Sequence, residues 1–357
     1  MHWGLASVPG FAQRELDVTQ VLRRRWHDFM AYSPYAEWYE NAMKLPGSLV
    51  AEHHRATYGN RPYEAFREDF ERGLAHWNPD AWAEAFADAG ARYVVMVTKH
   101  HDGYCLWPSR VRHPRRSRWA CSRDLVGELA AAVRARGLRF GVYYSGGIDW
   151  SFEERPVRTM SEFLVSQPGG AYADYAAAQV RELIERVRPD MLWNDISWPG
   201  TGADLVRLFT DYYAAVPDGV VNDRWTTREA VRLLGWRPVR WAFDAVTRLR
   251  LRGGRTLPPP PVLHADVRIM EYEVHPKAQH RPWECVRGMD KSFGYNRTSE
   301  EEDFLSRADL LGCLDDVVAK NGNLLINVGP RGEDGVIPAP QMARLRWLGE
   351  HMRARAD

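Results

Sequence analysis

The chain has 357 residues, of which 45% are hydrophobic and 27% charged, a composition typical of a folded protein. Its formal net charge of +1 gives no field to attract polyanions, so we expect neither nucleic acid nor an anionic membrane as a partner. The length suits a single α/β barrel, and no apolar run of about 18 residues predicts a membrane span.

Short β-branched runs alternate with amphipathic stretches along the chain. The predicted strands lie at 91–103, 137–150, 190–198, 219–225, 267–274 and 322–330. The predicted helices lie at 78–90, 122–137, 172–187 and 203–216. Alternating strands and helices indicate a parallel sheet, and this many units favours an α/β fold of the (β/α)8-like, TIM type over an open sheet.

Each of five predicted strands finishes in polar or aromatic residues suited to a ligand. In a barrel of this type, the carboxyl ends of the strands meet at one mouth, where the chemistry collects. The residues that we therefore expect around one mouth are His100, His101, Tyr144, Asp195, Arg224 and Glu271.

One segment interrupts the alternation. Residues 226–266 are rich in arginine and contain four consecutive prolines, which hold an extended path. A loop of this length is uncommon inside a compact domain and is usually functional or disordered. We expect a solvated or disordered insertion; an anion-binding segment is the alternative.

The chain has four cysteines, Cys105, Cys121, Cys285 and Cys313, without the C-x-x-C spacing of zinc sites. They suggest no disulfide framework and favour a reducing compartment. With no signal peptide visible, we expect a cytoplasmic location. The 15 Trp and 15 Tyr predict either core filling or stacking surfaces for a sugar-like ligand.

Two carboxylates stand out by their surroundings. Asp195 lies between Trp193 and Trp198, and Glu271 precedes Tyr272. Glycoside hydrolysis requires such a pair, one group to attack or stabilise the anomeric carbon and one to protonate the leaving oxygen. We expect the two at neighbouring strand ends. The alternative is structural: each carboxylate pairs with an arginine, for which Arg224 is available.

Two adjacent histidines form a second cluster, in "KHHDG". Neighbouring residues on a strand point to opposite sides, so His100 and His101 share a site only if the strand has ended. Just past a strand end, both suit ligand hydroxyls. A metal site would use His2, His100 and Asp195, but the sequence has no H-x-H or H-x-x-E-H spacing.

The combined strings resemble the α-L-fucosidases of glycoside hydrolase family twenty-nine. The likeness rests on "HWGLASVPGF", "EWY", "VVMVTKHHDGYCLW", "RFGVYYSGGIDW", "LWNDISWP", "VNDRW", "SFGYN" and "GNLLINVGPRGEDGVIP", in the expected order from residue 1 to about 350. The resemblance implies a distorted (β/α)8 barrel, usually followed by a β-sandwich, and a retaining enzyme that acts on terminal α-L-fucose of oligosaccharides or glycoconjugates.

The resemblance also assigns residues. It implies that Asp195 is the nucleophile and that Glu271, as in the bacterial branch, is the general acid/base. The positions that match sugar-binding residues are His2, Glu37, Trp38, His100, His101, Tyr144, Trp193 and Arg224. It implies neither a metal nor a cofactor.

The sequence departs from the family pattern in three ways. The insertion before Glu271 is roughly 35 residues longer than a compact connection. We expect residues 1–357 to form one catalytic barrel domain, truncated at the N-terminus before the first strand and without the C-terminal β-sandwich. The rival functions are a catalytically impaired or non-catalytic fucose-binding barrel and, third, a metal-dependent barrel hydrolase.

Overall fold

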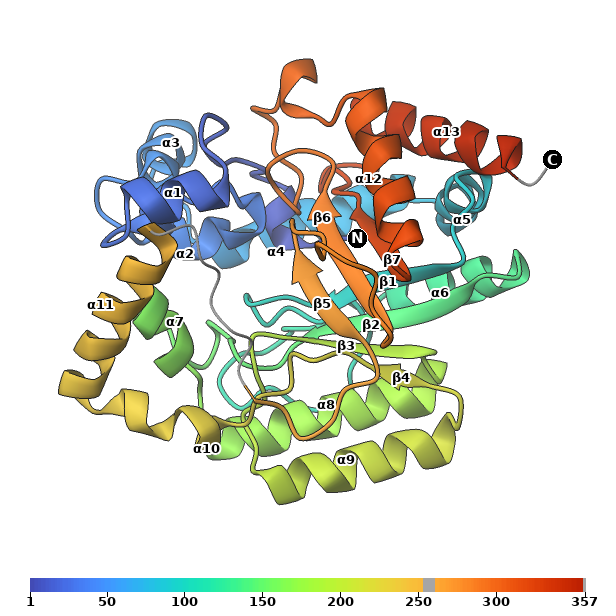
Figure 1. The fold of residues 1–357 in the computed structure, drawn as a ribbon. Helices are drawn as coiled ribbons and strands as arrows, with labels where there is room; N and C mark the ends of the chain where they lie inside the picture. Colours follow the sequence, from blue (N-terminus) through green and yellow to red (C-terminus); the bar gives the residue numbers. More distant parts are fainter. Residues whose placement is uncertain (253–260, 356–357) are drawn as a thin grey trace.

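The computed structural model describes residues 1–252 and 261–355, which form two parallel sheets enclosed by helices (Figure 1). The first sheet has the order β1 (Tyr93–Lys99), β2 (Arg139–Ser145), β3 (Met191–Asp195) and β4 (Val220–Val221). The second has the order β5 (Arg268–Glu271), β6 (Trp283–Gly288) and β7 (Gly322–Asn327).

Backbone hydrogen bonds join the two sheets on both sides. The Val267 N–H donates to the Val221 carbonyl at 3.2 Å, which connects β4 to β5. On the other side, the Met1 amino group donates to the Val95 carbonyl at 2.8 Å, and the His2 N–H donates to the Val328 carbonyl at 3.0 Å. The first two residues therefore lie between β7 and β1, and the whole has the expected (β/α)8-like architecture.

The four predicted helices are present. They are α5 (Pro79–Asp88), α6 (Leu125–Ala135), α8 (Ala171–Val187) and α9 (Gly202–Ala215). Asn78 caps α5 as predicted, because its side chain accepts from the N–H groups of Asp80 and Ala81. Two further helices, α12 (Arg307–Ala319) and α13 (Ala339–Ala354), flank β7 in the sequence.

Most of the remaining helices lie on the left of the molecule in Figure 1. The α-helices are α1 (Val18–Arg24), α2 (Tyr39–Met43), α3 (Leu49–Tyr58), α4 (Phe66–Gly73), α7 (Met160–Val165), α10 (Arg228–Val231) and α11 (Arg237–Arg252). The 3-10 helices are Leu5–Ser7, Phe29–Tyr32, Ala36–Trp38, Tyr63–Ala65, Leu74–His76, Arg232–Gly235 and Glu301–Asp303. None of the helices described is long and apolar enough to cross a membrane.

The insertion at 226–266 is largely helical where the structure describes it. Both α10 and α11 belong to it, and α11 packs against α1 and α7. The predicted solvated character applies in part, because most of α11 is exposed. The prolines of the predicted extended path at 258–260 lie outside the described residues.

One strand, β6, was not among the predicted elements. Its sequence, WECVRG, contains Glu284 and Arg287, so it does not read as an apolar run. Glu284 is nevertheless buried, because its carboxylate accepts hydrogen bonds from Tyr93 Oη and Trp193 Nε1. A charged residue inside a barrel needs such partners, which lie on other strands and cannot be seen locally.

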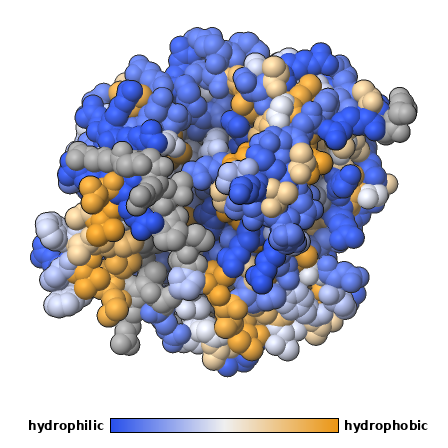
Figure 2. All heavy atoms as spheres, in the orientation of Figure 1, coloured by the Kyte–Doolittle hydropathy of each residue, from blue (hydrophilic) through white to orange (hydrophobic). Residues whose placement is uncertain are grey.

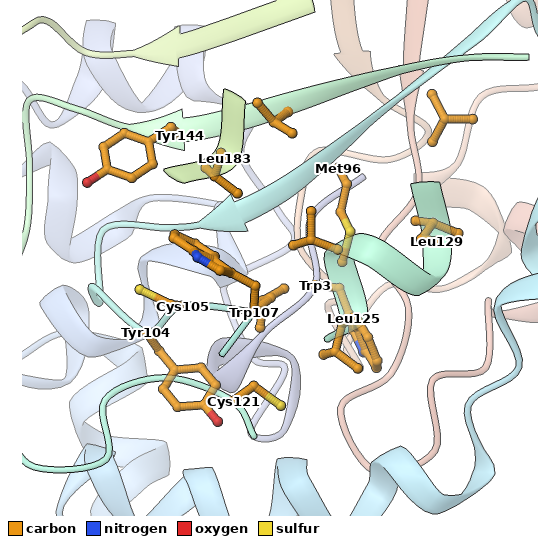
Figure 3. Packing of buried hydrophobic residues seen from close by; sticks show 14 of the residues in the cluster. Trp3, Met96, Tyr104, Cys105, Trp107, Cys121, Leu125, Leu129, Tyr144 and Leu183 are labelled. Atoms are coloured by element: carbon orange, nitrogen blue, oxygen red, sulfur yellow. The ribbon is translucent and has the colours of Figure 1, made fainter. Parts of the chain in front are cut away.

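The strands alternate between two cores, as the period of two requires. Inward-facing side chains form a cluster that includes Val95, Val97, Tyr143, Met191 and Trp193. Outward-facing side chains pack under the helices and include Val94, Met96, Val142, Tyr144 and Leu192. Figure 3 shows part of this outer core, with Tyr144 beside Leu183 of α8 and Met96 on the side of Leu129 of α6.

Candidate active site

The two predicted carboxylates meet at the mouth and share one arginine. Asp195 ends β3 and Glu271 ends β5. Arg224 follows β4, with a guanidinium nitrogen 3.2 Å from Glu271 Oε2 and another 3.9 Å from Asp195 Oδ1. The expectation of neighbouring strand ends is corrected, because β4 separates the two strands, and Arg224 bridges that gap.

Asp195 is held by hydrogen bonds from two sides. Tyr143 Oη donates to Oδ2 at 2.7 Å, and the Ile196 N–H donates to Oδ1 at 2.8 Å. Ile196 has a φ of 70°, a left-handed conformation that is costly for a β-branched residue and typical of functional sites. Burial raises the pKa of Asp195, and Arg224 and the Tyr143 hydrogen bond oppose that rise.

Glu271 lies closer to solvent, with a side chain 35% exposed against 17% for Asp195. Its Oε1 accepts a hydrogen bond from Tyr35 Oη at 2.9 Å. Tyr272, the next residue, also has a positive φ, of 57°. Both candidate catalytic carboxylates are thus followed by a strained residue. Tyr35 was not predicted, although it stands two residues before Glu37.

His100 and His101 lie just past the end of β1, with ring centroids 4.0 Å apart. His101 Nδ1 lies 2.6 Å from Ser145 Oγ, and its Nε2 lies 3.9 Å from Asp195 Oδ2. The predicted turn past the strand end therefore brings both rings to one site. Burial lowers the pKa of both histidines well below the ordinary range, so they are neutral and can donate and accept hydrogen bonds.

His2 joins this group from the start of the chain. Its ring centroid lies 5.4 Å from that of His100 and 5.3 Å from that of Tyr143. Its Nδ1 lies 2.9 Å from Asn327 Oδ1 at the end of β7, which fixes the ring. Burial, with the nearby amino terminus, lowers the pKa of His2 to about 3.

Glu37 and Trp38 come from a buried 3-10 turn. Glu37 Oε2 accepts from the Gly294 N–H at 2.7 Å and from Ser292 Oγ at 3.2 Å. Burial raises the pKa of Glu37 to about 7. Glu37 lines one cavity with His2 and His100, and the Trp38 ring lies edge-on to His101 at 4.8 Å.

Trp193 lies deeper, inside the barrel. Its ring stacks on Tyr143 at 5.4 Å, and its Nε1 donates to Glu284 Oε1 at 3.0 Å. The Arg224 guanidinium lies 6.0 Å from the ring centroid. Trp193 therefore packs against Tyr143 and lies near Arg224 on the inner side of the site.

Tyr144 is the predicted residue that the structure places elsewhere. Its side chain points outward into the helix-covered core, where its Oη donates to Gln179 at 2.8 Å (Figure 3). Tyr143 occupies the position expected of Tyr144, because successive residues on a strand face opposite sides. The sequence held the signal: Tyr143 pairs in register with Trp193, two residues before Asp195 on the same face.

The metal-site alternative finds no suitable donor set. Over residues 1–252 and 261–355, no group of three His, Cys, Asp or Glu side chains could hold a metal ion. His2 is instead oriented by Asn327, and Asp195 by Tyr143 and Arg224. What the described residues assemble is a carboxylate pair, a bridging cation and three neutral imidazoles.

Comparisons with known proteins agree with this arrangement. The sequence profile of the family described as Alpha-L-fucosidase matches residues 1–357. The bovine tissue alpha-L-fucosidase is 28% identical over 98% of this chain and 64% of its own length, so the chain spans less than two thirds of that relative.

Solved structures of fucosidases share the fold. One described as an alpha-L-fucosidase is 41% identical, with a TM-score of 0.84, and is matched over 100% of this chain and 72% of its own. The Thermotoga maritima alpha-fucosidase in complex with fucose is also 41% identical, with a TM-score of 0.80 and the same coverage. From its motifs, its barrel and its match to the family profile along the whole sequence, the chain belongs to the alpha-L-fucosidase family.

Proposed function

We propose that this protein is a retaining α-L-fucosidase that removes terminal α-L-fucosyl residues by double displacement. The observation that carries the proposal is the carboxylate pair at one mouth, Asp195 deep and Glu271 near solvent, with Arg224 between them. Membership of the alpha-L-fucosidase family indicates that the sugar is L-fucose, and we infer that the substrates are fucosylated oligosaccharides or glycoconjugates.

In the first step, an Asp195 oxygen attacks the anomeric carbon while the bond to the leaving oxygen breaks. Glu271, as the acid, transfers its proton to that oxygen, so the aglycone leaves as a neutral alcohol. In the second step, Glu271 takes a proton from water, whose oxygen displaces Asp195 from the anomeric carbon. Arg224 and Tyr143 favour the ionised form of Asp195 against the effect of burial.

The remaining side chains bind the sugar. Neutral His100 and His101 provide both a donor and an acceptor for ring hydroxyls, and Glu37 adds a carboxyl group fixed by Gly294. Trp38 offers an apolar face, which suits the methyl group of a 6-deoxy sugar. His2 completes the set beside His100.

The nucleophile is tested with Asp195→Ala on an aryl α-L-fucoside. We expect kcat/KM to fall by about a thousandfold or more, because no other side chain replaces Asp195 as the group that bonds to the anomeric carbon. Added azide then replaces the carboxylate in a single displacement and gives the β-fucosyl azide. If Asp195→Ala keeps most of the wild-type activity, the assignment fails.

The acid/base is tested with Glu271→Ala on aryl fucosides with good and poor leaving groups. We expect a larger loss with the poor leaving group, since it needs the proton more. Azide then intercepts the glycosyl-enzyme and gives the α-fucosyl azide. Equal loss on both substrates assigns the acid to another residue.

The second candidate is a fucose-binding barrel without turnover, motivated by the cavity lined by His2, Glu37 and His100, which can hold a sugar whether or not its glycosidic bond is cleaved. Calorimetry with fucose and turnover of aryl α-L-fucosides and aryl α-L-galactosides separate the two candidates. Wild-type protein that binds fucose but turns over none of the glycosides favours the second candidate.

A further inference from the structure

The helix α11 exposes its apolar face to solvent. Half of the ten strongly exposed large apolar side chains in the described residues lie within 233–249. They are Leu233 (72%) and Trp236 (66%), just before α11, and Trp241 (75%), Val246 (57%) and Leu249 (73%) within it. Hydrophobic residues gather along α11 on the face that Figure 2 shows. An exposed group of large apolar side chains of this kind marks a contact surface.

Helical spacing makes this patch a stripe. Trp241, Ala245 and Leu249 follow one another at intervals of four residues, and all three are exposed. The opposite face of α11 is attached to the protein: Thr247 is buried, and Asp244 accepts a hydrogen bond from Ser161 Oγ at 2.5 Å. The helix is thus amphipathic, with both faces in use and its apolar stripe directed outward.

Arginines lie along α11: Arg237 and Arg248 are beside Trp241 at the edge of the stripe, and Arg240 and Arg250 lie farther round the helix. Arg237, Arg240, Arg248 and Arg250 are exposed or half-buried, and within the described residues none of them forms an ion pair. Asp244 is the single acidic residue of α11. The net charge of +1 for the whole chain averages over this local excess of positive charge. The partner of this surface must therefore offer both an apolar region that buries the stripe and negative charge that pairs with the arginines.

We propose that α11 is a membrane-surface anchor that binds anionic phospholipid. Apolar side chains with tryptophans on one face, and arginines beside them, are the features of helices that lie in the headgroup region of a bilayer. Trp236 and Trp241 suit the boundary between headgroups and acyl chains, and the arginines suit lipid phosphates. A second copy of the chain fits less well, because two α11 helices face to face oppose arginine with arginine.

The experiment measures binding of the whole chain to large unilamellar vesicles. One set contains phosphatidylcholine alone, and the other contains about a third phosphatidylglycerol. We expect co-flotation with the anionic vesicles, little with the neutral ones, and weakening as salt rises. The double variant Trp241→Ser/Leu249→Ser should bind roughly a hundredfold more weakly. The control Leu49→Ser/Val206→Ser, at exposed positions on α3 and α9, should bind like wild type.

A charge series provides a second readout. The triple variant Arg237→Gln/Arg248→Gln/Arg250→Gln should lose roughly a hundredfold in binding, about fivefold for each arginine. The control Arg181→Gln/Arg207→Gln/Arg307→Gln changes the net charge equally at exposed or half-buried sites on other helices and should bind like wild type. Circular dichroism and unchanged turnover of an aryl fucoside confirm folding, because none of these residues lies in the proposed catalytic site.

Four outcomes overturn the proposal. The first is no binding of the wild type to anionic vesicles, and the second is equal losses in the α11 and control variants. The third is a wild-type dimer in light scattering, without vesicle binding, that Trp241→Ser/Leu249→Ser dissociates; this result assigns the stripe to a second copy. Capture of an acidic protein in place of vesicles likewise assigns it to a protein partner.

Discussion

At the scale of single residues, Tyr143 and Tyr144 form a matched pair for testing the site. They are neighbours on β2, both are buried, and each donates one hydrogen bond from its hydroxyl, Tyr143 to Asp195 and Tyr144 to Gln179. Substitution by phenylalanine removes one oxygen atom, with its hydrogen, at either position. The two variants therefore separate a role in the site from a role in the core.

Tyr143→Phe should lower kcat/KM by roughly ten- to a hundredfold, because Asp195 loses a donor that favours its charge. Tyr144→Phe should leave kcat/KM within about twofold and cost about 1 kcal/mol of stability, since Gln179 loses its donor. Steady-state kinetics and thermal unfolding of both variants measure this. The reverse pattern would return the site to Tyr144.

Glu37 links a single residue to the pH dependence of stability. Its pKa is raised to about 7 in the folded chain from an ordinary value of 4.5. A raised carboxyl pKa contributes stability that is present below the ordinary pKa and lost as pH rises through the folded one. The isosteric amide retains an oxygen for the Gly294 and Ser292 hydrogen bonds and carries no proton to lose.

Between pH 4.5 and 8, Glu37→Gln should therefore gain stability relative to wild type as pH rises. The gain amounts to about 3 kcal/mol at most, in line with the size of the pKa shift. Thermal unfolding of both proteins at several pH values gives the difference. A difference that stays constant with pH would falsify the assignment of this shift to Glu37.

At the scale of elements, a buried ion pair connects the end of β1 to the loop that follows β2. Lys99 Nζ lies 2.8 Å from Asp149 Oδ2, and both side chains are fully buried. Tyr172 Oη of α8 lies 3.0 Å from the same nitrogen. Next to Asp149, the Trp150 N–H donates to the His101 carbonyl at 2.7 Å. The pair thus anchors the segments that carry the histidines.

Asp149→Asn should cost about 3–5 kcal/mol of stability, because it leaves the Lys99 ammonium buried without its counter-charge. Asp211→Asn, which breaks the exposed pair with Arg181, should cost less than about 1 kcal/mol. Denaturant unfolding of the two variants compares them directly. Equal small losses would mean that the buried pair does not anchor the loop.

At the scale of the whole molecule, the barrel mouth concentrates histidines that folding keeps neutral. His100 and His101 follow β1 and His2 lies between β7 and β1, and burial lowers the pKa of all three. A lowered histidine pKa contributes stability that is present above the ordinary value of 6.5 and lost as pH falls toward the folded value. A fall in pH therefore destabilises the fold by favouring protonation of the histidines at the mouth of the barrel.

His100→Gln should lose less stability than wild type when the pH falls from 7 to 5, because one proton-binding ring is absent in the variant. Thermal unfolding at the two pH values, in buffers of equal ionic strength, gives the comparison. A parallel loss in both proteins would show that His100 does not take part in the acid response.

The sequence by itself determined the strands β1 to β5 and β7, four helices, and most of the residues at the mouth. These follow from local patterns, since apolar periodicity reports which residues face a core and strand ends carry polar residues. Tyr143 was within reach of the same rule, because it shares the period of two with Trp193 and Asp195. The strand β6 was not within reach of that rule, because it contains the charged residue Glu284. The partners that allow Glu284 to be buried come from β1 and β3.

Only the tertiary structure decided the relations between distant segments. Arg224 bridges carboxylates 76 residues apart in sequence, Tyr35 reaches Glu271, and Met1 and His2 lie between β7 and β1. The outward apolar face of α11 was equally hidden, because an amphipathic pattern does not say which face meets the protein. Periodicity is a property of a segment, whereas the partner of each face is a property of the packed chain.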